Sequence, residues 1–427
     1  MSTPDSVSQE TDEPMNFEAL RRDDPVLADL LASEQRRQEE TIDLIASENY
    51  CPRSVREAAS SVLTDKYAEG YPDHRWYGGC EIADAVEQLA IERGKRLFGA
   101  QHINVQPHSG SQANMAVYFA VLEPGDTILS MDLAHGGHLT HGMAANFSGR
   151  LYRIAHYGVS PETEQIDYDA VARQAREVRP ALIIGGASAY PRAIRSDRLA
   201  EIAADVGAKL MVDMAHFAGL VVGGQHPDPV PVSDFVTATT HKTLRGPRGG
   251  LILCKADYAK TIDHTIFPGI QGGPLMHIIA GKAAAFALAM TDSFKVYQAQ
   301  VVANARAMAA EMASLGYRIV SGGTDTHLFL VDLSPRGVSG IQAQGWLGEA
   351  GIIVNKNVIP FDRRGPLDPS GIRIGTPSAT TRGAREDDVR RLARWIHGVL
   401  SAEDPSRAAK ALRPEVREFC RSHPIPD

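Results

Sequence analysis

Two stretches of this sequence decide its fold: KLMVDMAH at residues 209–216 and FVTATTHKT at residues 235–243. Each begins with a short, mostly apolar run, which predicts a buried strand, and each ends in polar side chains. Asp213 and His216 follow the first run, while His241 and Lys242 follow the second. Because ligands of an open parallel sheet lie beyond the carboxyl ends of its strands, these side chains are candidates for a functional site.

The alternation of strands and helices extends in both directions from these stretches. Further strands are expected at residues 103–106, 127–131, 181–185 and 250–254, and helices at 81–98, 112–122 and 196–206. Ser196 is the expected cap of the last helix, and Ile82, Val86, Leu89 and Leu97 are the expected apolar face of the first. This pattern predicts an α/β fold with a mostly parallel sheet covered on both faces.

Four segments are expected along the chain: an acidic disordered tail at residues 1–24, an N-terminal helical arm at 25–65, a large domain at 66–295 and a small C-terminal α/β domain at 296–427. The arm opens with a helix at 25–40 whose apolar residues Val26, Leu27, Leu30 and Leu31 need a surface to pack on. Strands at 327–331, 352–354 and 372–374 mark the small domain.

Composition and charge argue against several classes of protein. The chain of 427 residues carries a net charge of −8, and seven acidic against two basic residues among the first 24 account for −5 of it. A body close to neutral offers no electrostatic footprint for nucleic acid. The four cysteines are far apart in the sequence, and neither a leader nor a membrane segment is evident, so a cytoplasmic location is expected.

The residues after the strands combine into one kind of chemistry. Singly, Lys242 could be a solvated lysine, Asp213 a turn cap, and the Ser109-Gly110-Ser111 turn a helix cap. Together, an amine that can form a Schiff base, an acid at a neighbouring strand end and an anion cradle at a helix start are what pyridoxal phosphate requires. The acid keeps the ring nitrogen protonated, and the ring withdraws electrons from the substrate's α-carbon.

Ordered motifs carry a resemblance to a known family. They are LIASEN (44–49), KYAEGYP (66–72), VQPHSGSQ (105–112), LAHGGHLTHG (133–142), VDMAH (212–216), THKT (240–243), GPRGG (246–250), FPG (267–269), QGGPLMH (271–277), SGGTD (321–325), VNKN (354–357) and GIR (371–373). Over residues 25–402 the chain resembles the serine hydroxymethyltransferases. The resemblance implies a fold-type I, aspartate-aminotransferase-like architecture and a homodimer or pair of dimers. It also implies exchange of serine and tetrahydrofolate for glycine and 5,10-methylenetetrahydrofolate in one-carbon and amino-acid metabolism.

Roles carried over from this resemblance fall into four groups. For the cofactor, pyridoxal 5'-phosphate, they are Lys242 as Schiff-base lysine, Asp213 at the ring nitrogen, His138 stacked on the ring, Ser188 and His216 near the phenolic oxygen, Ser109, Gly110, Ser111 and His241 at the phosphate, and Tyr67 and Gly273 from a partner subunit. For the substrate they are Arg373 for the carboxylate, Ser47 and Tyr77 assisting it, and Glu69 of the neighbouring chain for protons on the hydroxymethyl group. Thr239 and Arg248 support these groups, and Leu133, Gly137, Leu139 and Asn357 line the folate site.

The histidine triple His135, His138 and His141 allows a second interpretation, a metal site. The glycines between these residues disfavour a helix, and no acidic or thiol ligand is adjacent in sequence, so we expect no metal there. Trp76, Ala187, Ile270 and the loop 361–370 depart from the family pattern.

Two other functions share parts of this evidence. A related aldolase, or a hydroxymethyltransferase for α-methylserine, would also retain Lys242 and Asp213. A catalytically silent homologue acting as a binding protein would lack one of them. Tyr67, Glu69 and Tyr77, which occur together here, favour the ordinary serine enzyme.

Overall fold

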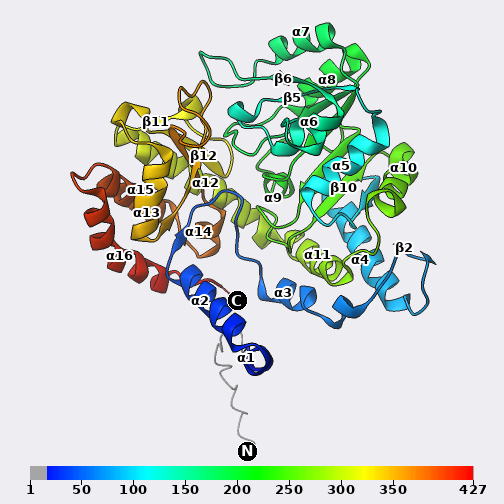
Figure 1. Ribbon diagram of the computed structural model, residues 1–427, viewed down its shortest axis with the longest axis horizontal. Helices are drawn as coiled ribbons and strands as arrows, with labels where there is room; N and C mark the ends of the chain where they lie inside the picture. The colour runs from blue at the N-terminus through cyan, green and yellow to red at the C-terminus, as the bar shows by residue number, and fades with distance from the viewer. Residues whose placement is uncertain (1–16, 427) are drawn as a thin grey trace, which may run out of the picture.

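The computed structural model describes residues 17–426 and arranges them around two principal sheets (Figure 1). The larger sheet has seven strands, in the order β4 (His102–Asn104), β10 (Gly250–Cys254), β9 (Phe235–Thr239), β8 (Lys209–Asp213), β7 (Leu182–Gly185), β5 (Thr127–Met131) and β6 (Arg153–Tyr157). The five strands from β9 to β6 are parallel, and β10 runs antiparallel to both of its neighbours. The expected α/β fold with a mostly parallel sheet is confirmed.

Helices cover both faces of this sheet. Successive side chains of a strand point to opposite faces, and in the central strands both sets include buried apolar residues, so both faces must be shielded from water. Leu210 and Val212 of β8 join one apolar cluster, and Met211 between them joins the other. The first cluster includes residues of α4 (Glu81–Phe98), α7 (Tyr168–Val178), α8 (Ser196–Val206) and α11 (Met276–Ala289). The second includes residues of α5 (Gly110–Val121) and α10 (Ala259–His264).

The smaller sheet is antiparallel throughout. Its order is β11 (Arg318–Ile319), β12 (Leu328–Asp332), β15 (Gly371–Gly375) and β14 (Asn355–Asn357), and it packs with α12 (Asp292–Ser314), α13 (Gly340–Ala350), α15 (Glu386–Leu400) and α16 (Pro405–Ser422). The strand expected at 352–354 lies outside this sheet. It forms β13 (Ile352–Ile353), which pairs in parallel with β1 (Ile42–Asp43), because the buried segment around Ile42 and Leu44 inserts beside it.

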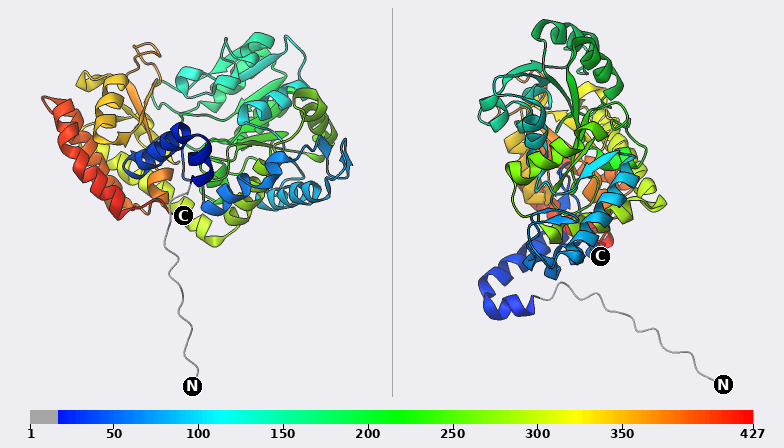
Figure 2. Two further views of the ribbon diagram at one scale, coloured as in Figure 1. Left: turned by 60° about the horizontal axis from the view of Figure 1, so that its bottom comes forward. Right: turned by 90° about the vertical axis from the view of Figure 1, so that its right-hand side faces the viewer.

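The first two helices, α1 (Glu18–Asp23) and α2 (Pro25–Glu39), project from the rest of the molecule (Figure 2). Of the expected tail, residues 1–16 lie outside the described residues. Helical structure begins at α1 rather than at Pro25, because Arg21 pairs with Asp29 and Asp24 caps α2. The apolar residues of α2 that need a partner surface remain uncovered, with Val26 70% and Leu30 63% exposed.

Two local expectations about the helices were wrong. In α4, Ile82 is exposed, and the buried stripe is instead Ala83, Glu87, Ala90, Gly94 and Phe98. Glycine fits position 94 in this stripe, because a side chain there would collide with Ile103 of β4 and Phe286 of α11. Ser196 is not the cap of α8: Arg195 occupies that position, and the buried Ser196 hydroxyl has no hydrogen-bond partner among the described residues.

The remaining short elements are α3 (Arg53–Ala59), α6 (Phe147–Leu151), α9 (Ala218–Val222), α14 (Pro377–Thr381) and the hairpin β2 (Gly70–Tyr71) and β3 (His74–Arg75). Within residues 17–426, no helix has both the length and the apolar character needed to cross a membrane.

Candidate functional site

Asp213, at the carboxyl end of β8, is held by three hydrogen bonds. Its Oδ2 accepts from Asn114 Nδ2 at 2.9 Å and from His141 Nε2 at 3.1 Å, and its Oδ1 accepts from the Ala215 amide at 3.0 Å. These donors hold the pKa of the buried carboxyl below its usual range, although desolvation acts in the opposite direction. Asp213 is therefore a fixed anion with one acceptor position on Oδ1 unused.

Asn114 and His141 were not predicted to hold Asp213. Asn114 lies inside the apolar helix α5, and its Oδ1 accepts from Thr237 Oγ1 at 2.6 Å. His141 Nδ1 accepts from the His138 amide at 3.3 Å, which leaves the proton on Nε2, where it bonds to Asp213. The sequence held one indication of a role for Asn114: it is a polar residue within a largely apolar helix.

The histidine triple does not come together. His135 Nδ1 accepts from the Val159 amide, away from the other two, whereas His138 and His141 have Asp213 beside them. The acid beside these two histidines comes from a distant part of the sequence, because Asp213 lies at the end of β8. Ligand atoms of these three residues lie within 4.8 Å of one another, but the bond between His141 and Asp213 already joins two of them. Burial lowers the pKa of His138 to about 4, so its imidazole is neutral.

Lys242 lies in the loop that follows β9. Burial lowers the pKa of its amine to about 8; Arg373 and Arg248 lower it further, whereas Asp213 acts in the opposite direction. Its backbone carbonyl accepts from Asn49 Nδ2 at 3.2 Å, which fixes the loop to the N-terminal segment. The geometry thus presents an amine that is readily deprotonated near neutral pH.

The turn at Ser109 is a helix cap with a tightly packed backbone. Ser109 Oγ accepts from the Gln112 amide at 3.2 Å at the start of α5, as one of the two interpretations predicted. A side chain on Gly110 would come within 2.7 Å of Thr239, and one on Gly250 would collide with the Ser109 carbonyl. The nearby His241 is largely buried, and its Nδ1 has no hydrogen-bond partner in the described part of the chain. Ser111 is exposed at the first turn of the helix.

Arg373 projects from β15 of the smaller sheet toward the larger one. Its Nη1 donates to the Ser188 carbonyl at 2.6 Å, and its Nε donates to Asn355 Oδ1 at 3.1 Å. Desolvation lowers its pKa to about 10, and no carboxylate of residues 17–426 forms an ion pair with it. Ser47 lies near this strand, since the preceding Ala46 packs directly against Gly375. The guanidinium is therefore a largely desolvated cation without an anionic partner.

A histidine pair joins the two sheets beneath this arginine. His216 Nδ1 and His327 Nε2 are 3.3 Å apart, and the rings stack with centroids 5.5 Å apart. Burial lowers the pKa of both imidazoles, so both are neutral and share a single hydrogen bond. His216 is thereby held beside the end of β8, near Lys242.

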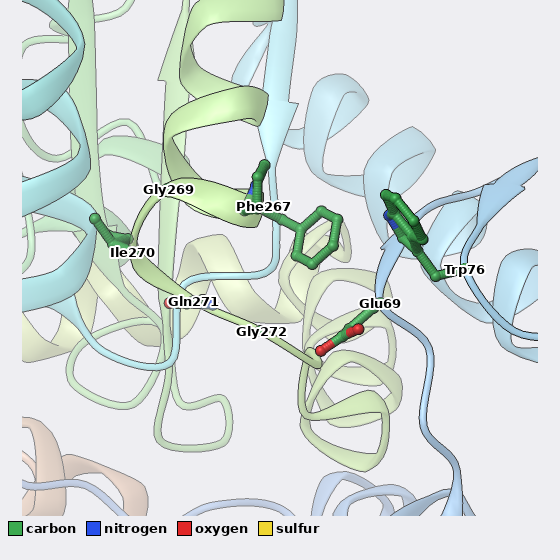
Figure 3. Close-up of a pocket in the computed structure, with 8 residues that line it drawn as sticks. Glu69, Trp76, Phe267, Gly269, Ile270, Gln271 and Gly272 are labelled. Atoms are coloured by element: carbon green, nitrogen blue, oxygen red, sulfur yellow. The ribbon is translucent and has the colours of Figure 1, made fainter.

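The three residues expected from a partner subunit, Tyr67, Glu69 and Gly273, lie together with Tyr77 and Gly272. We call this group of five the Tyr67 cluster. Tyr77 donates to Glu69 Oε2 at 3.2 Å, its ring meets that of Tyr67 edge to face, and Tyr67 packs against Gly273. Tyr67 is 57% exposed. Figure 3 shows Glu69 beside Gly272, at one side of an open cavity of about 570 Å³.

Trp76 and Ile270, which depart from the family pattern, also line this cavity (Figure 3). The Trp76 side chain is 74% exposed and lies on the opposite side of the cavity from Ile270. Both substitutions therefore alter the wall of the cavity beside Glu69.

The residues expected at a folate site come from both principal sheets. Leu133 and Leu139 are exposed in the loop after β5, Gly137 between them packs against the Met131 carbonyl, and Asn357 ends β14. The loop 361–370, which departs from the family pattern, reaches the same region. The ring of Phe361 contacts that of His135, with centroids 4.9 Å apart.

Comparisons with known proteins all lead to one family. A family model described as serine hydroxymethyltransferase matches residues 20–396. A protein named serine hydroxymethyltransferase from Acidobacterium capsulatum is 56% identical over 407 residues, 95% of each chain. A protein of the same name from Koribacter versatilis is 56% identical over 408 residues, 96% of each chain.

Proposed function

This chain belongs to the serine hydroxymethyltransferase family, and from that premise we propose that it transfers the hydroxymethyl group of serine reversibly to tetrahydrofolate. The products are glycine and 5,10-methylenetetrahydrofolate, in one-carbon and amino-acid metabolism. The fold is accordingly that of a fold-type I enzyme. The observation that carries the proposal is the convergence of Lys242, the fixed anion Asp213 and the unpaired cation Arg373 where the two principal sheets meet.

The family depends on pyridoxal 5'-phosphate, and the residues of this chain fit that group. The start of α5 offers free amides at Ser109–Ser111, and the unpartnered Nδ1 of the largely buried His241 lies nearby. Asp213 has an acceptor left for a protonated ring nitrogen. When bound, the cofactor withdraws electrons from the substrate's α-carbon.

Several residues of this chain have separate roles in binding and orienting the cofactor. Lys242 would hold the cofactor through its amine, Asp213 would keep a proton on the ring nitrogen, and the neutral imidazole of His138 would lie against the ring. Ser188 and His216 orient the phenolic oxygen, while Thr239 and Arg248 support the lysine loop. The roles of Lys242, Asp213 and His138 use the protonation states described above.

Arg373 binds the carboxylate of serine, with Ser47 and Tyr77 assisting it. The guanidinium is held in place by Ser188 and Asn355, so little freedom is lost when a carboxylate binds. Because a forked cation matches the two carboxylate oxygens, this pairing recognises the carboxylate of the substrate.

A homodimer supplies the remaining groups. The exposed Tyr67 cluster and the uncovered apolar face of α2 support an active site shared between two copies, with Tyr67, Glu69 and Gly273 contributed by the partner. Glu69 moves the proton on the hydroxymethyl oxygen, and Tyr77 fixes the orientation of its carboxyl. Leu133, Gly137, Leu139 and Asn357 bind the folate. The four cysteines are free thiols, which supports a cytoplasmic location.

We expect replacement of Arg373 with lysine to raise the KM for serine about a hundredfold, because an ammonium cannot form the bidentate pair. The spectrum of the bound cofactor should stay unchanged. Steady-state kinetics and a spectral titration with serine measure both quantities. Arg318→Lys is a matched control, since this arginine lies on the same sheet but already pairs with Glu164 and Asp332. A normal KM in Arg373→Lys would refute the assignment.

Formation of glycine from serine, measured with and without tetrahydrofolate, tests the proposed reaction itself. The transferase should depend strongly on folate, because folate accepts the one-carbon unit. An aldolase would cleave its substrate at the same rate in both assays. Folate-independent cleavage, or no cleavage at all, would overturn the proposed function.

A further inference from the structure

Lys282 interrupts the long apolar helix α11, and no role has been assigned to it above. It lies in α11 and is only 1% exposed. Its Nζ donates to the backbone carbonyls of Val105 at 2.6 Å, Gly250 at 2.8 Å and Pro107 at 3.1 Å. Three acceptors around one nitrogen match the three N–H donors of an ammonium, whereas a neutral amine would leave one carbonyl without a donor.

Lys282 holds one segment that leads into the expected phosphate cradle at Ser109 and a second segment, at Gly250, that borders it. Val105 and Pro107 lead directly into Ser109, and the Gly250 amide donates to the Pro107 carbonyl at 3.0 Å. A side chain at Gly249 would lie 3.1 Å from Lys282 Nζ, and the Gly249 carbonyl accepts from the Thr240 amide, next to His241. Lys282 therefore lies directly behind the cradle and joins its two sides.

Among residues 17–426, no carboxylate forms an ion pair with Lys282. Glu87 is the acid that faces it, but Arg75 binds Glu87 at 2.6 Å and Asp84 at 2.7 Å, and Gln106 donates to the other Glu87 oxygen. The imidazoles of His108 and His241 also face the ammonium, and the pKa of each is lowered by burial, so they are neutral. Burial lowers the pKa of Lys282 itself to about 7, and an anion nearby would favour the charged form.

We propose that Lys282 is a positioning residue for phosphate recognition. Its buried ammonium fixes the carbonyls that shape the cradle and supplies the positive charge behind it for a phosphate monoester dianion. The inference rests on the proposed cofactor site, since it assigns the phosphate of pyridoxal 5'-phosphate to this cradle.

Comparison of pyridoxal 5'-phosphate with pyridoxal, which lacks the phosphate, tests this role. Dissociation constants for both are measured by absorbance titration of cofactor-free wild-type protein, Lys282→Met and Lys282→Gln. Both variants remove the charge, and glutamine retains hydrogen-bond donors. We expect the preference for the phosphorylated form to fall about thirtyfold in both variants, with the affinity for pyridoxal little changed.

Arg93→Met is the matched control. Arg93 on α4 donates to the Ala283 carbonyl of α11 at 2.8 Å, so this variant loosens the same helix without touching the cradle. It should lower the melting temperature and leave the preference for phosphate intact.

Three results would contradict a role of Lys282 in phosphate recognition. An unchanged preference in a folded Lys282 variant, an equal loss of affinity for both ligands, or failure of both neutral variants to fold would overturn the inference. If wild-type protein bound neither ligand, the proposed function itself would fail, which is a different result from a wild-type preference that survives removal of Lys282.

Discussion

Lys242→Ala is expected to lower turnover of serine about 10⁴-fold, because this substitution removes the amine that holds the cofactor. After reduction with borohydride, mass spectrometry of wild-type protein should find the reduced cofactor on the peptide that contains Lys242. The variant should carry none. Lys255→Ala is the control, since Lys255 is a half-exposed lysine at the opposite end of the sheet, paired with Asp234 at 2.7 Å.

The same lysine predicts a pH dependence in cofactor-free protein. Only the neutral amine attacks an aldehyde, and the pKa of Lys242 is lowered to about 8. The rate of cofactor capture should therefore rise as the pH increases and level off above about 8. A solvated lysine would continue to gain rate up to about pH 10. Label on a lysine other than Lys242, or activity of the variant within tenfold of wild type, would contradict the assignment.

The strands that carry the site could be predicted from sequence because they are buried on both faces. Residues 235–239 and 250–254 were expected as strands and form β9 and β10 with those bounds. β6 (Arg153–Tyr157) was missed because it is the edge strand and carries exposed, polar residues at Arg153 and His156. In the small domain, strands were expected at 327–331 and 372–374, but their antiparallel pairing was not predicted. Local pattern indicates that a strand exists but not which strand it pairs with.

For the site residues too, local sequence pattern predicted some positions, and others depended on the fold. Asp213 and Lys242 were predictable because they directly follow buried strands, where ligand-binding groups gather. No role was predicted for Asn114, His141 or Lys282. Asn114 and His141 act through Asp213, which is more than 70 positions away in sequence, and Lys282 acts through backbone carbonyls. A lone polar residue in an apolar helix indicates that a buried partner exists, but only the fold identifies it.

Asp213→Asn is expected to reduce kcat about 10³-fold, because it removes the anion that holds a proton on the ring nitrogen. A charge pair at contact distance contributes about 4 kcal/mol at an effective dielectric constant of 20, which corresponds to about a thousandfold in rate. The amide also cannot replace the carboxylate within its own hydrogen bonds. Either orientation of its NH₂ group faces a donor: Asn114 and His141 on one side, or the Ala215 amide on the other.

Asp234→Asn separates this electrostatic effect from a loss of stability. Asp234 also accepts from a backbone amide, that of Leu210 at 2.9 Å, and pairs with a cation, but it lies at the opposite end of the same strands. Both variants should unfold at lower urea concentration, whereas only Asp213→Asn should lose turnover and shift the visible absorption of the bound cofactor. A folded Asp213→Asn enzyme with kcat within tenfold of wild type would mean that ring protonation does not depend on this carboxylate. The three donors around Asp213 would then serve only to bury its charge.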